Sequence, residues 1–144
     1  MDGKKNILIL GAGLSSSSLL RYLLGSAEQE NWHLNIVDQN LEALTKRINK
    51  HPHARALSFD ALQSSERQPE IAKADLVISM LPAAHHVEVA KDCILLGKNL
   101  ITPSYVSKEM MELHQDAVDK DILIMNELGV DPGIDHMSAM RVLD

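Results

Sequence analysis

The chain has 144 residues, of which 45% are hydrophobic and 24% charged, a composition typical of one soluble globular domain. Its formal net charge of −6 and its scattered basic residues argue against binding to nucleic acid or to an anionic membrane. Aromatic residues make up only 3% of the chain, too few for the base-stacking surfaces of single-strand binders.

Cysteine usage and hydropathy predict a cytoplasmic protein. Cys93 is the single cysteine, so an internal disulfide cannot form, and we expect this side chain to pack as a small hydrophobe. The sequence shows no signal peptide and no apolar run long enough to cross a bilayer.

The stretch 4–18 predicts a buried strand, a glycine turn and the first turn of a helix. The apolar run 7–10 is typical of a parallel strand covered on both faces, and Gly11 ends it. Gly13 has no Cβ to keep a diphosphate away from the backbone, and the N–H groups of the next helix would face the anion. We therefore predict a cofactor phosphate site at Gly11, Ala12, Gly13, Leu14, Ser15 and Ser16.

Ser16 stands where the dinucleotide fingerprint G-x-G-x-x-G has its third glycine. Serine is small enough for close helix–strand packing, and the hydroxyls of residues 15–17 are candidate phosphate donors. Asp38 ends the second apolar run, where a carboxylate accepts hydrogen bonds from the adenosine ribose. These positions together predict a dinucleotide site.

Further apolar runs alternate with helical patterns along the chain. Strands are expected at 33–38, 55–59, 75–81, 99–102 and 122–125, and helices at 19–26, 41–48, 63–73, 87–96 and 107–119. This alternation predicts a Rossmann-type α/β fold, a doubly wound parallel sheet of order 3-2-1-4-5-6 between two helical layers. Ligand groups should then come from the carboxyl ends of the strands.

Several other residues at strand ends are candidates for the same site. Asp60 is placed to contact adenine or to cap the next helix, and the two readings carry similar weight. Leu81 and Pro82 end the fourth strand and are predicted cofactor contacts. The seven histidines show no metal-binding spacing, so no metal site is expected, and the serine run lacks the G-x-S-x-G pattern of a nucleophile elbow.

The last residues predict a connection to a second domain. Residues 129–136 are a dense turn signal, and Met137, Met140, Val142 and Leu143 then begin an apolar helix. We therefore expect a cofactor-binding domain over 1–133, with 134–144 starting a helix toward an absent substrate or dimerisation domain. The chain is interpreted as the amino-terminal part of a larger enzyme.

Three blocks, 78–82, 102–107 and 125–136, resemble the glutamate-forming branch of the saccharopine dehydrogenase family. The third, Met-Asn-Glu-Leu-Gly-Val-Asp-Pro-Gly-Ile-Asp-His, is long and distinctive. The resemblance implies nicotinamide-dependent oxidation of saccharopine to glutamate and aminoadipate semialdehyde, or the reverse reaction, in lysine metabolism. It also implies substrate contacts at Ser104, Tyr105 and Asp131, cofactor contacts at Leu128, Gly129 and Gly133, and a full-length enzyme compatible with a homodimer. The catalytic acid and base stay unassigned.

The cofactor preference departs from that of NADP-using members, which have an arginine after the second strand. Here Asp38 is followed by Gln39 and Asn40, so a carboxylate faces the position of a 2′-phosphate without a neighbouring guanidinium. NAD is favoured over NADP on this ground.

Three alternatives stay open at the level of sequence. Relatives in the family act on other substrates such as carboxynorspermidine, and a non-catalytic NAD-binding module would differ only in lacking a substrate domain. An AdoMet-dependent methyltransferase is less favoured, because Leu10 rather than an acidic residue precedes the glycine turn.

Overall fold

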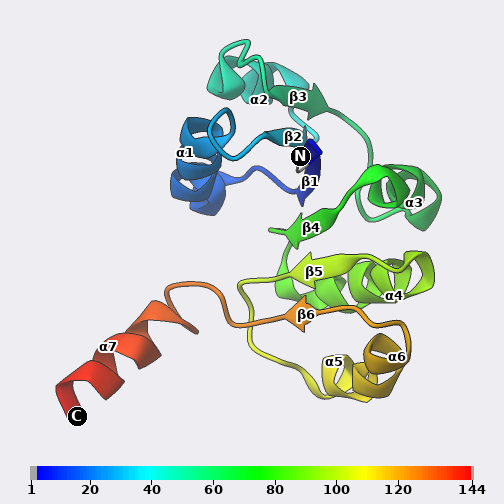
Figure 1. The fold of residues 1–144 in the computed structure, drawn as a ribbon, viewed down its shortest axis with the longest axis vertical. Coiled ribbons are helices and arrows are strands. Elements are labelled where there is room, and N and C mark those ends of the chain that lie inside the picture. The colour runs from blue at the N-terminus through cyan, green and yellow to red at the C-terminus, as the bar shows by residue number, and fades with distance from the viewer. Residues whose placement is uncertain (1–2, 144) are drawn as a thin grey trace.

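A six-stranded parallel sheet runs through the centre of the molecule in the order β3-β2-β1-β4-β5-β6 (Figure 1). The structure is a computed structural model and describes residues 3–143. The strands are β1 (Lys5–Leu10), β2 (Trp32–Val37), β3 (Ala54–Leu57), β4 (Leu76–Ser79), β5 (Asn99–Ile101) and β6 (Ile124–Met125). The predicted Rossmann-type topology is thereby confirmed.

Helices connect the strands and cover the sheet on both faces. They are α1 (Ser17–Ser26), α2 (Leu41–Ile48), α3 (Ser64–Lys73), α4 (His86–Leu96), α5 (Lys108–Glu112), α6 (His114–Asp119) and α7 (Ile134–Leu143). Short 3₁₀ turns precede α1 and α4, at Leu14–Ser16 and Ala83–His85. Because each crossover joins two parallel strands, the carboxyl ends of all strands lie along one edge of the sheet.

The alternation of side chains along β1 divides the core into two layers. Ile7 and Ile9 pack with the apolar faces of α1 and α2, while Leu8 and Leu10 pack with those of α3, α4 and α5. Each of these four β1 side chains is at most 5% exposed. β1 is therefore buried on both faces, as its continuous apolar run predicts.

The strands predicted at 55–59 and 75–81 end earlier than expected, at Leu57 and Ser79, and two further elements differ from the prediction. The helix expected over 107–119 is divided into α5 and α6 at Leu113, whose backbone departs from α-helical angles with ψ −2°. Ser107 does cap the first of them, since its Oγ accepts from the Met110 amide at 3.1 Å. Only Ile124 and Met125 of the run 122–125 form a strand, pairing with Leu100 and Ile101 of β5, while the Leu123 amide donates to the Asn99 side chain at 2.8 Å.

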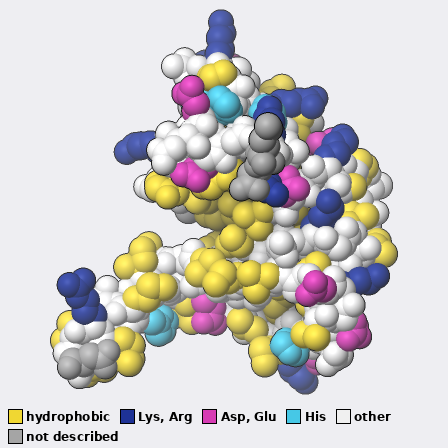
Figure 2. All heavy atoms as spheres, in the orientation of Figure 1, with side chains coloured by type: hydrophobic (Ala, Val, Ile, Leu, Met, Phe, Trp, Pro, Cys, Tyr) yellow, Lys and Arg dark blue, Asp and Glu magenta, His cyan; other side chains and the backbone are white. Residues whose placement is uncertain are grey.

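The segment α7 extends away from the sheet as an arm (Figure 1). None of its residues is buried, and Met137, Met140 and Leu143 are 63%, 55% and 79% exposed. Apolar side chains also gather in the hollow between this arm and the α1 side of the molecule (Figure 2). An apolar pocket of about 300 Å³ lies between α1 and the sheet, and its lining includes Tyr22, Met80 and Leu128.

Candidate functional site

The glycine turn after β1 follows the predicted geometry. Gly11 has φ +95°, and a Cβ added there would lie 3.0 Å from the carbonyl oxygen of Met80 in the residues following β4. A side chain at this position is therefore strained by the backbone conformation and crowded by the backbone after β4. Gly13 differs, because its φ of −63° suits any residue and a Cβ added there would have no non-neighbouring atom within 4 Å. The space in front of Gly13 is open.

The serine hydroxyls of this turn bond mainly to the backbone. Ser16 is fully buried, and its hydroxyl donates to the carbonyl of Gly13 at 2.7 Å. Ser17 donates to the carbonyl of Leu14 at the same distance. The expectation that these two hydroxyls donate to phosphate needs correction, because both protons are already used in the turn. Ser15 and the 95% exposed Leu14 remain on the surface.

Charged side chains hold the turn from two sides. The Asp38 carboxylate accepts from the Ala12 amide at 3.0 Å and from the Asn40 amide at 2.8 Å. The guanidinium of Arg47, in the last turn of α2, donates to the carbonyl of Ala12 and to Ser17 Oγ, the latter at 2.9 Å. No arginine follows Asp38 directly in the sequence, whereas the fold brings the Arg47 guanidinium to the turn from nine positions further along the chain.

Five predicted cofactor residues line one cavity of about 290 Å³ at the carboxyl edge: Gly11, Asp38, Asp60, Leu81 and Pro82. Sequence reasoning missed the six other lining residues, which end or follow a strand near this edge: Val37, Gln39, Phe59, Ala61, Leu62 and His85. Asp60 does not cap α3, because the N-cap is Gln63 and the Asp60 carboxylate accepts from the Leu62 amide at 3.0 Å. Carboxylates on apolar walls suit the hydroxyls and the flat base of an adenosine.

The three predicted substrate residues lie after β5 and β6. The Tyr105 hydroxyl donates to the Asp131 carboxylate, and this hydrogen bond raises the pKa of Tyr105 to about 12. Tyr105 is therefore a protonated donor at neutral pH. Ser104 has a different partner, since its Oγ lies 2.9 Å from Nε2 of His86. The structure thus joins Tyr105 with Asp131, and joins Ser104 with a histidine that the sequence analysis had not assigned.

The turn that contains Leu128, Gly129 and Gly133 packs against the end of β5. Gly133 has φ +144°, and a Cβ there would lie 2.2 Å from the carbonyl oxygen of Gly129, so only glycine fits. The Leu128 amide donates to the Thr102 carbonyl at 3.3 Å, and Leu128 lines the apolar pocket that also contains Tyr22 and Met80. None of these three residues lines the cavity of Asp38.

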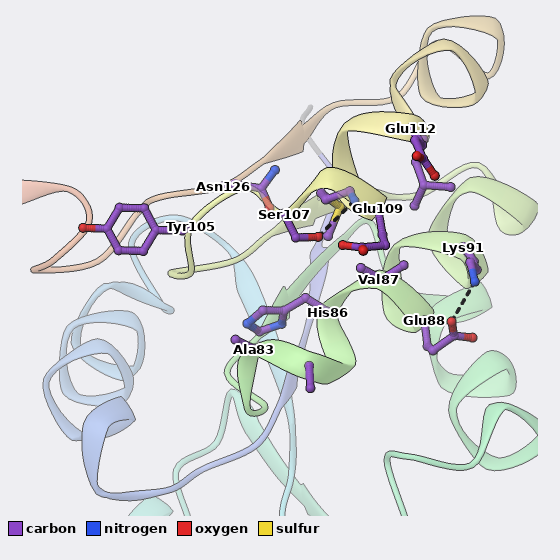
Figure 3. Close-up of a pocket in the computed structure, with 13 residues that line it drawn as sticks. Ala83, His86, Val87, Glu88, Lys91, Tyr105, Ser107, Glu109, Glu112 and Asn126 are labelled. Atoms are coloured by element: carbon purple, nitrogen blue, oxygen red, sulfur yellow. Dashed lines mark hydrogen bonds and ion pairs between the residues drawn. The ribbon is translucent and has the colours of Figure 1, made fainter.

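A larger cavity of about 580 Å³ lies between α4 and α5 (Figure 3). His86 and Glu109 border it, whereas the ring of Tyr105 points away from its centre. His86 is only 3% exposed, and burial lowers its pKa, with a smaller contribution from the neighbouring His85. The imidazole is therefore neutral at pH 7.

Cys93, the metal-binding residue types and the helices are the remaining candidates for other functions. Cys93 is fully buried, and burial raises its pKa to about 12, so it packs as a hydrophobe as expected. Within residues 3–143, no three His, Cys, Asp or Glu side chains are placed to hold a metal ion. No helix in the described part of the chain has the length and apolarity needed to span a membrane.

A glycine turn between a parallel strand and a helix, beside a carboxylate-lined cavity where the strand order reverses, defines a nicotinamide-dinucleotide-binding Rossmann domain. Comparison with known families agrees with this class. The chain belongs to the family described as saccharopine dehydrogenase NADP binding domain, whose model matches residues 7–125. The resemblance read from the sequence is confirmed.

Individual relatives support the same family. The chain is 37% identical over 140 residues to saccharopine dehydrogenase [NADP(+), L-glutamate-forming] of Pyricularia oryzae, covering 97% of this chain and 30% of that protein. It is 38% identical over 145 residues to the mitochondrial alpha-aminoadipic semialdehyde synthase of Bos taurus, covering 100% of this chain and 15% of the relative. The apo saccharopine dehydrogenase (L-Glu forming) of Saccharomyces cerevisiae superposes with a TM-score of 0.85 at 30% identity, covering 97% of this chain and 31% of that one. The chain therefore spans less than a third of these relatives.

The residues present fit a nicotinamide dinucleotide. The open space at Gly13 provides a backbone surface for the pyrophosphate, and the cavity at Asp38 offers acceptors for a ribose. The guanidinium of Arg47 adds positive charge to the phosphate turn. The chain is an NAD(P)-binding domain, and it corresponds to the cofactor-binding part of oxidoreductases.

Proposed function

We propose that this chain is the cofactor-binding part of an enzyme that oxidises the CH–NH group of saccharopine, or runs the reverse reductive condensation. Carbon–nitrogen oxidation of this kind removes a hydride, which a bound nicotinamide accepts. Water then hydrolyses the resulting imine to glutamate and aminoadipate semialdehyde. Family membership supports the substrate class, and the paired Tyr105 and Asp131 at the carboxyl edge are the observation that carries the proposal.

The cofactor is assigned to the residues of the glycine turn and the adenosine cavity. Gly11 to Ser16 form the phosphate turn, and Asp38, Asp60, Leu81 and Pro82 surround the adenosine end. Leu128, Gly129 and Gly133 are proposed to border the nicotinamide end, because their turn packs on the end of β5. Together these sets support a cofactor position along the carboxyl edge of the sheet.

Substrate contacts are assigned to Ser104, Tyr105 and Asp131. Asp131 is an anion beside an exposed edge, so it suits the ammonium group of an amino acid. Tyr105 donates to this carboxylate and holds its orientation. Ser104 follows β5 on the same edge and offers a hydroxyl to the polar groups of the substrate.

NAD is proposed as the preferred cofactor on electrostatic grounds. The Asp38 carboxylate would repel a 2′-phosphate, while Arg47 lies at the Ala12 carbonyl on the same turn and reduces that repulsion. The preference for NADH over NADPH should therefore be finite rather than absolute.

The domain boundaries and cellular context complete the proposal. Residues 1–133 form the cofactor domain, and 134–144 begin a connection to a substrate domain, which is supported by the exposed apolar side chains of α7. The complete enzyme is proposed to be cytoplasmic and homodimeric, with a small amino-acid conjugate as its substrate and no nucleic-acid partner.

The test separates cofactor binding from catalysis. The 144 residues should bind NADH in a fluorescence titration but should not reduce NAD⁺ with saccharopine, because one nucleotide-binding layer leaves the crevice open to water. A chain extended by its substrate domain should do both, and Asp131→Ala in that chain should lower turnover without changing NADH affinity. An extended enzyme that ignores saccharopine would remove the proposed substrate, and activity in the 144 residues alone would contradict the division of labour.

A further inference from the structure

Three side chains form a hydrogen-bonded series across the ends of β4 and β5. Ser79, the last residue of β4, has its Oγ 2.9 Å from Nδ1 of His86, the first residue of α4. Nε2 of the same ring lies 2.9 Å from Oγ of Ser104, which follows β5. Ser79 is fully buried and His86 is 3% exposed, whereas Ser104 is half-buried at the carboxyl edge. The series therefore runs from the core to the substrate side.

The buried end of the series fixes the position of the imidazole proton. Within residues 3–143, the Ser79 hydroxyl has Nδ1 of His86 as its single side-chain hydrogen-bond partner. A buried hydroxyl places its proton on an acceptor, so Nδ1 must carry a lone pair. The ring is neutral, because burial lowers its pKa, and its one proton is then on Nε2. The opposite tautomer would leave the Ser79 proton unpaired in the core.

This tautomer determines what Ser104 offers to a ligand. With the proton on Nε2, His86 donates to Ser104 Oγ. The Ser104 hydroxyl proton then has no acceptor within the series and is available to donate to another group. A hydroxyl that accepts one hydrogen bond becomes a better donor in the next. We infer that Ser79 and His86 hold Ser104 as an outward hydrogen-bond donor, matched to a carboxylate oxygen of the amino-acid substrate. His86 is in this scheme a positioning residue.

The identity of the ligand in this inference rests on the proposed function, whereas the tautomer of His86 is independent of it. The tautomer can be measured in the 144-residue chain by ¹⁵N–¹H correlation spectra of the histidine rings. His86 should show a protonated Nε2 and an unprotonated Nδ1, and Ser79→Ala should remove this exclusive state. A protonated Nδ1 in the unchanged chain would overturn the inference whatever the substrate.

Two substitutions separate the two ends of the imidazole. In His86→Gln the amide group reaches the position of Nε2, and in His86→Asn it reaches the position of Nδ1. If His86 positions Ser104, His86→Gln should keep the KM for saccharopine within about threefold of the unchanged enzyme in the extended chain. His86→Asn should raise that KM about tenfold with little change in kcat, since one charge-assisted hydrogen bond is weakened.

NADH affinity should not change in either variant, and His114→Asn on the exposed start of α6 is the control. Equal increases of KM in His86→Gln and His86→Asn would show a merely structural role for His86 and overturn the inference. An extended enzyme without saccharopine turnover would contradict the proposed function, while the tautomer measurement would still decide the role of Ser79 and His86.

Discussion

Gly11 and Gly13 lie two residues apart in one turn, and we expect their substitutions to affect different properties, stability at Gly11 and NADH affinity at Gly13. An alanine at position 11 would have to keep the φ of +95° that Gly11 has. Its Cβ would lie 3.0 Å from the Met80 carbonyl oxygen. A left-handed conformation costs a residue with a Cβ about 1–2 kcal/mol, and the close contact adds to this. Gly11→Ala should therefore destabilise the fold by about 2 kcal/mol or more, which lowers the Tm by roughly 4–8 °C in a chain of this size.

At Gly13 the backbone conformation and the space both permit a side chain. Its φ of −63° and ψ of −177° suit any residue, and a Cβ would meet no non-neighbouring atom within 4 Å. Gly13→Val should leave the Tm within about 2 °C, because restriction of the unfolded chain offsets small losses. The new methyl groups would occupy the space of the pyrophosphate. Loss of even one charge-assisted hydrogen bond, about 1.5–3 kcal/mol, weakens NADH binding at least tenfold.

The assay combines thermal unfolding by circular dichroism with NADH fluorescence titration on both variants and the unchanged chain. We expect Gly13→Val to lose affinity and keep stability, and Gly11→Ala to lose stability. Normal NADH binding by Gly13→Val would show that the pyrophosphate lies elsewhere. A Gly11→Ala protein as stable as the parent would show that the approach of β1 to the residues after β4 is not as close as described.

Three other predictions address charge and protonation. Asp38→Ala should narrow the ratio of NADH to NADPH affinity by roughly tenfold in fluorescence titrations. The reason is that the repulsion between a carboxylate and a phosphate about 4 Å apart costs ~1–2 kcal/mol in water. An unchanged affinity ratio would contradict the electrostatic argument. Arg67→Met should lower the free energy of unfolding by about 3–5 kcal/mol in urea titrations, because it leaves Asp92 as an unpaired charge with a side chain only 9% exposed. The double variant with Asp92→Leu should recover most of that loss, and no recovery would point to packing instead. In a Tyr22→Phe background, which leaves Tyr105 as the one tyrosine, ultraviolet titration should show a pKa of about 12 for Tyr105. Asp131→Asn should lower this pKa toward 10, the ordinary value for tyrosine. An unchanged pKa in Asp131→Asn would refute the hydrogen bond.

Local patterns in the sequence were sufficient to predict most of the fold. The run 7–10 predicts a doubly buried strand because four consecutive apolar residues leave no polar face, and Gly97 marks the end of α4 through its φ of +65°. The break at Leu113 could not be foreseen, since 107–119 contains neither proline nor glycine. The short β6 was also unforeseen, because strand length depends on the partner that each residue finds.

The site was predictable in its turns and not in its long-range pairs. Gly11 and Asp38 follow apolar runs, so their places at the sheet edge come directly from the strand pattern. Arg47 reaches Ala12 across 35 residues, and His86 reaches Ser104 across 18. Such contacts depend on how helices are set against the sheet, and no spacing along the chain signals them. A guanidinium in the last turn of a helix is otherwise typical of simple dipole stabilisation.

These long-range pairs show where side chains link the strand ends along the carboxyl edge of the sheet. The residues after β2 are linked to those after β1 by Asp38, and the ends of β4 and β5 are linked by His86. The ends of β5 and β6 are linked by Thr102, whose hydroxyl donates to Asn126 at 3.0 Å. After β1 and β4, in contrast, the two chain segments meet through their backbones, where Gly11 lies close to the Met80 carbonyl. Side chains therefore link the strand ends on both sides of the point where the strand order reverses, and this point is where we expect the cofactor to bind.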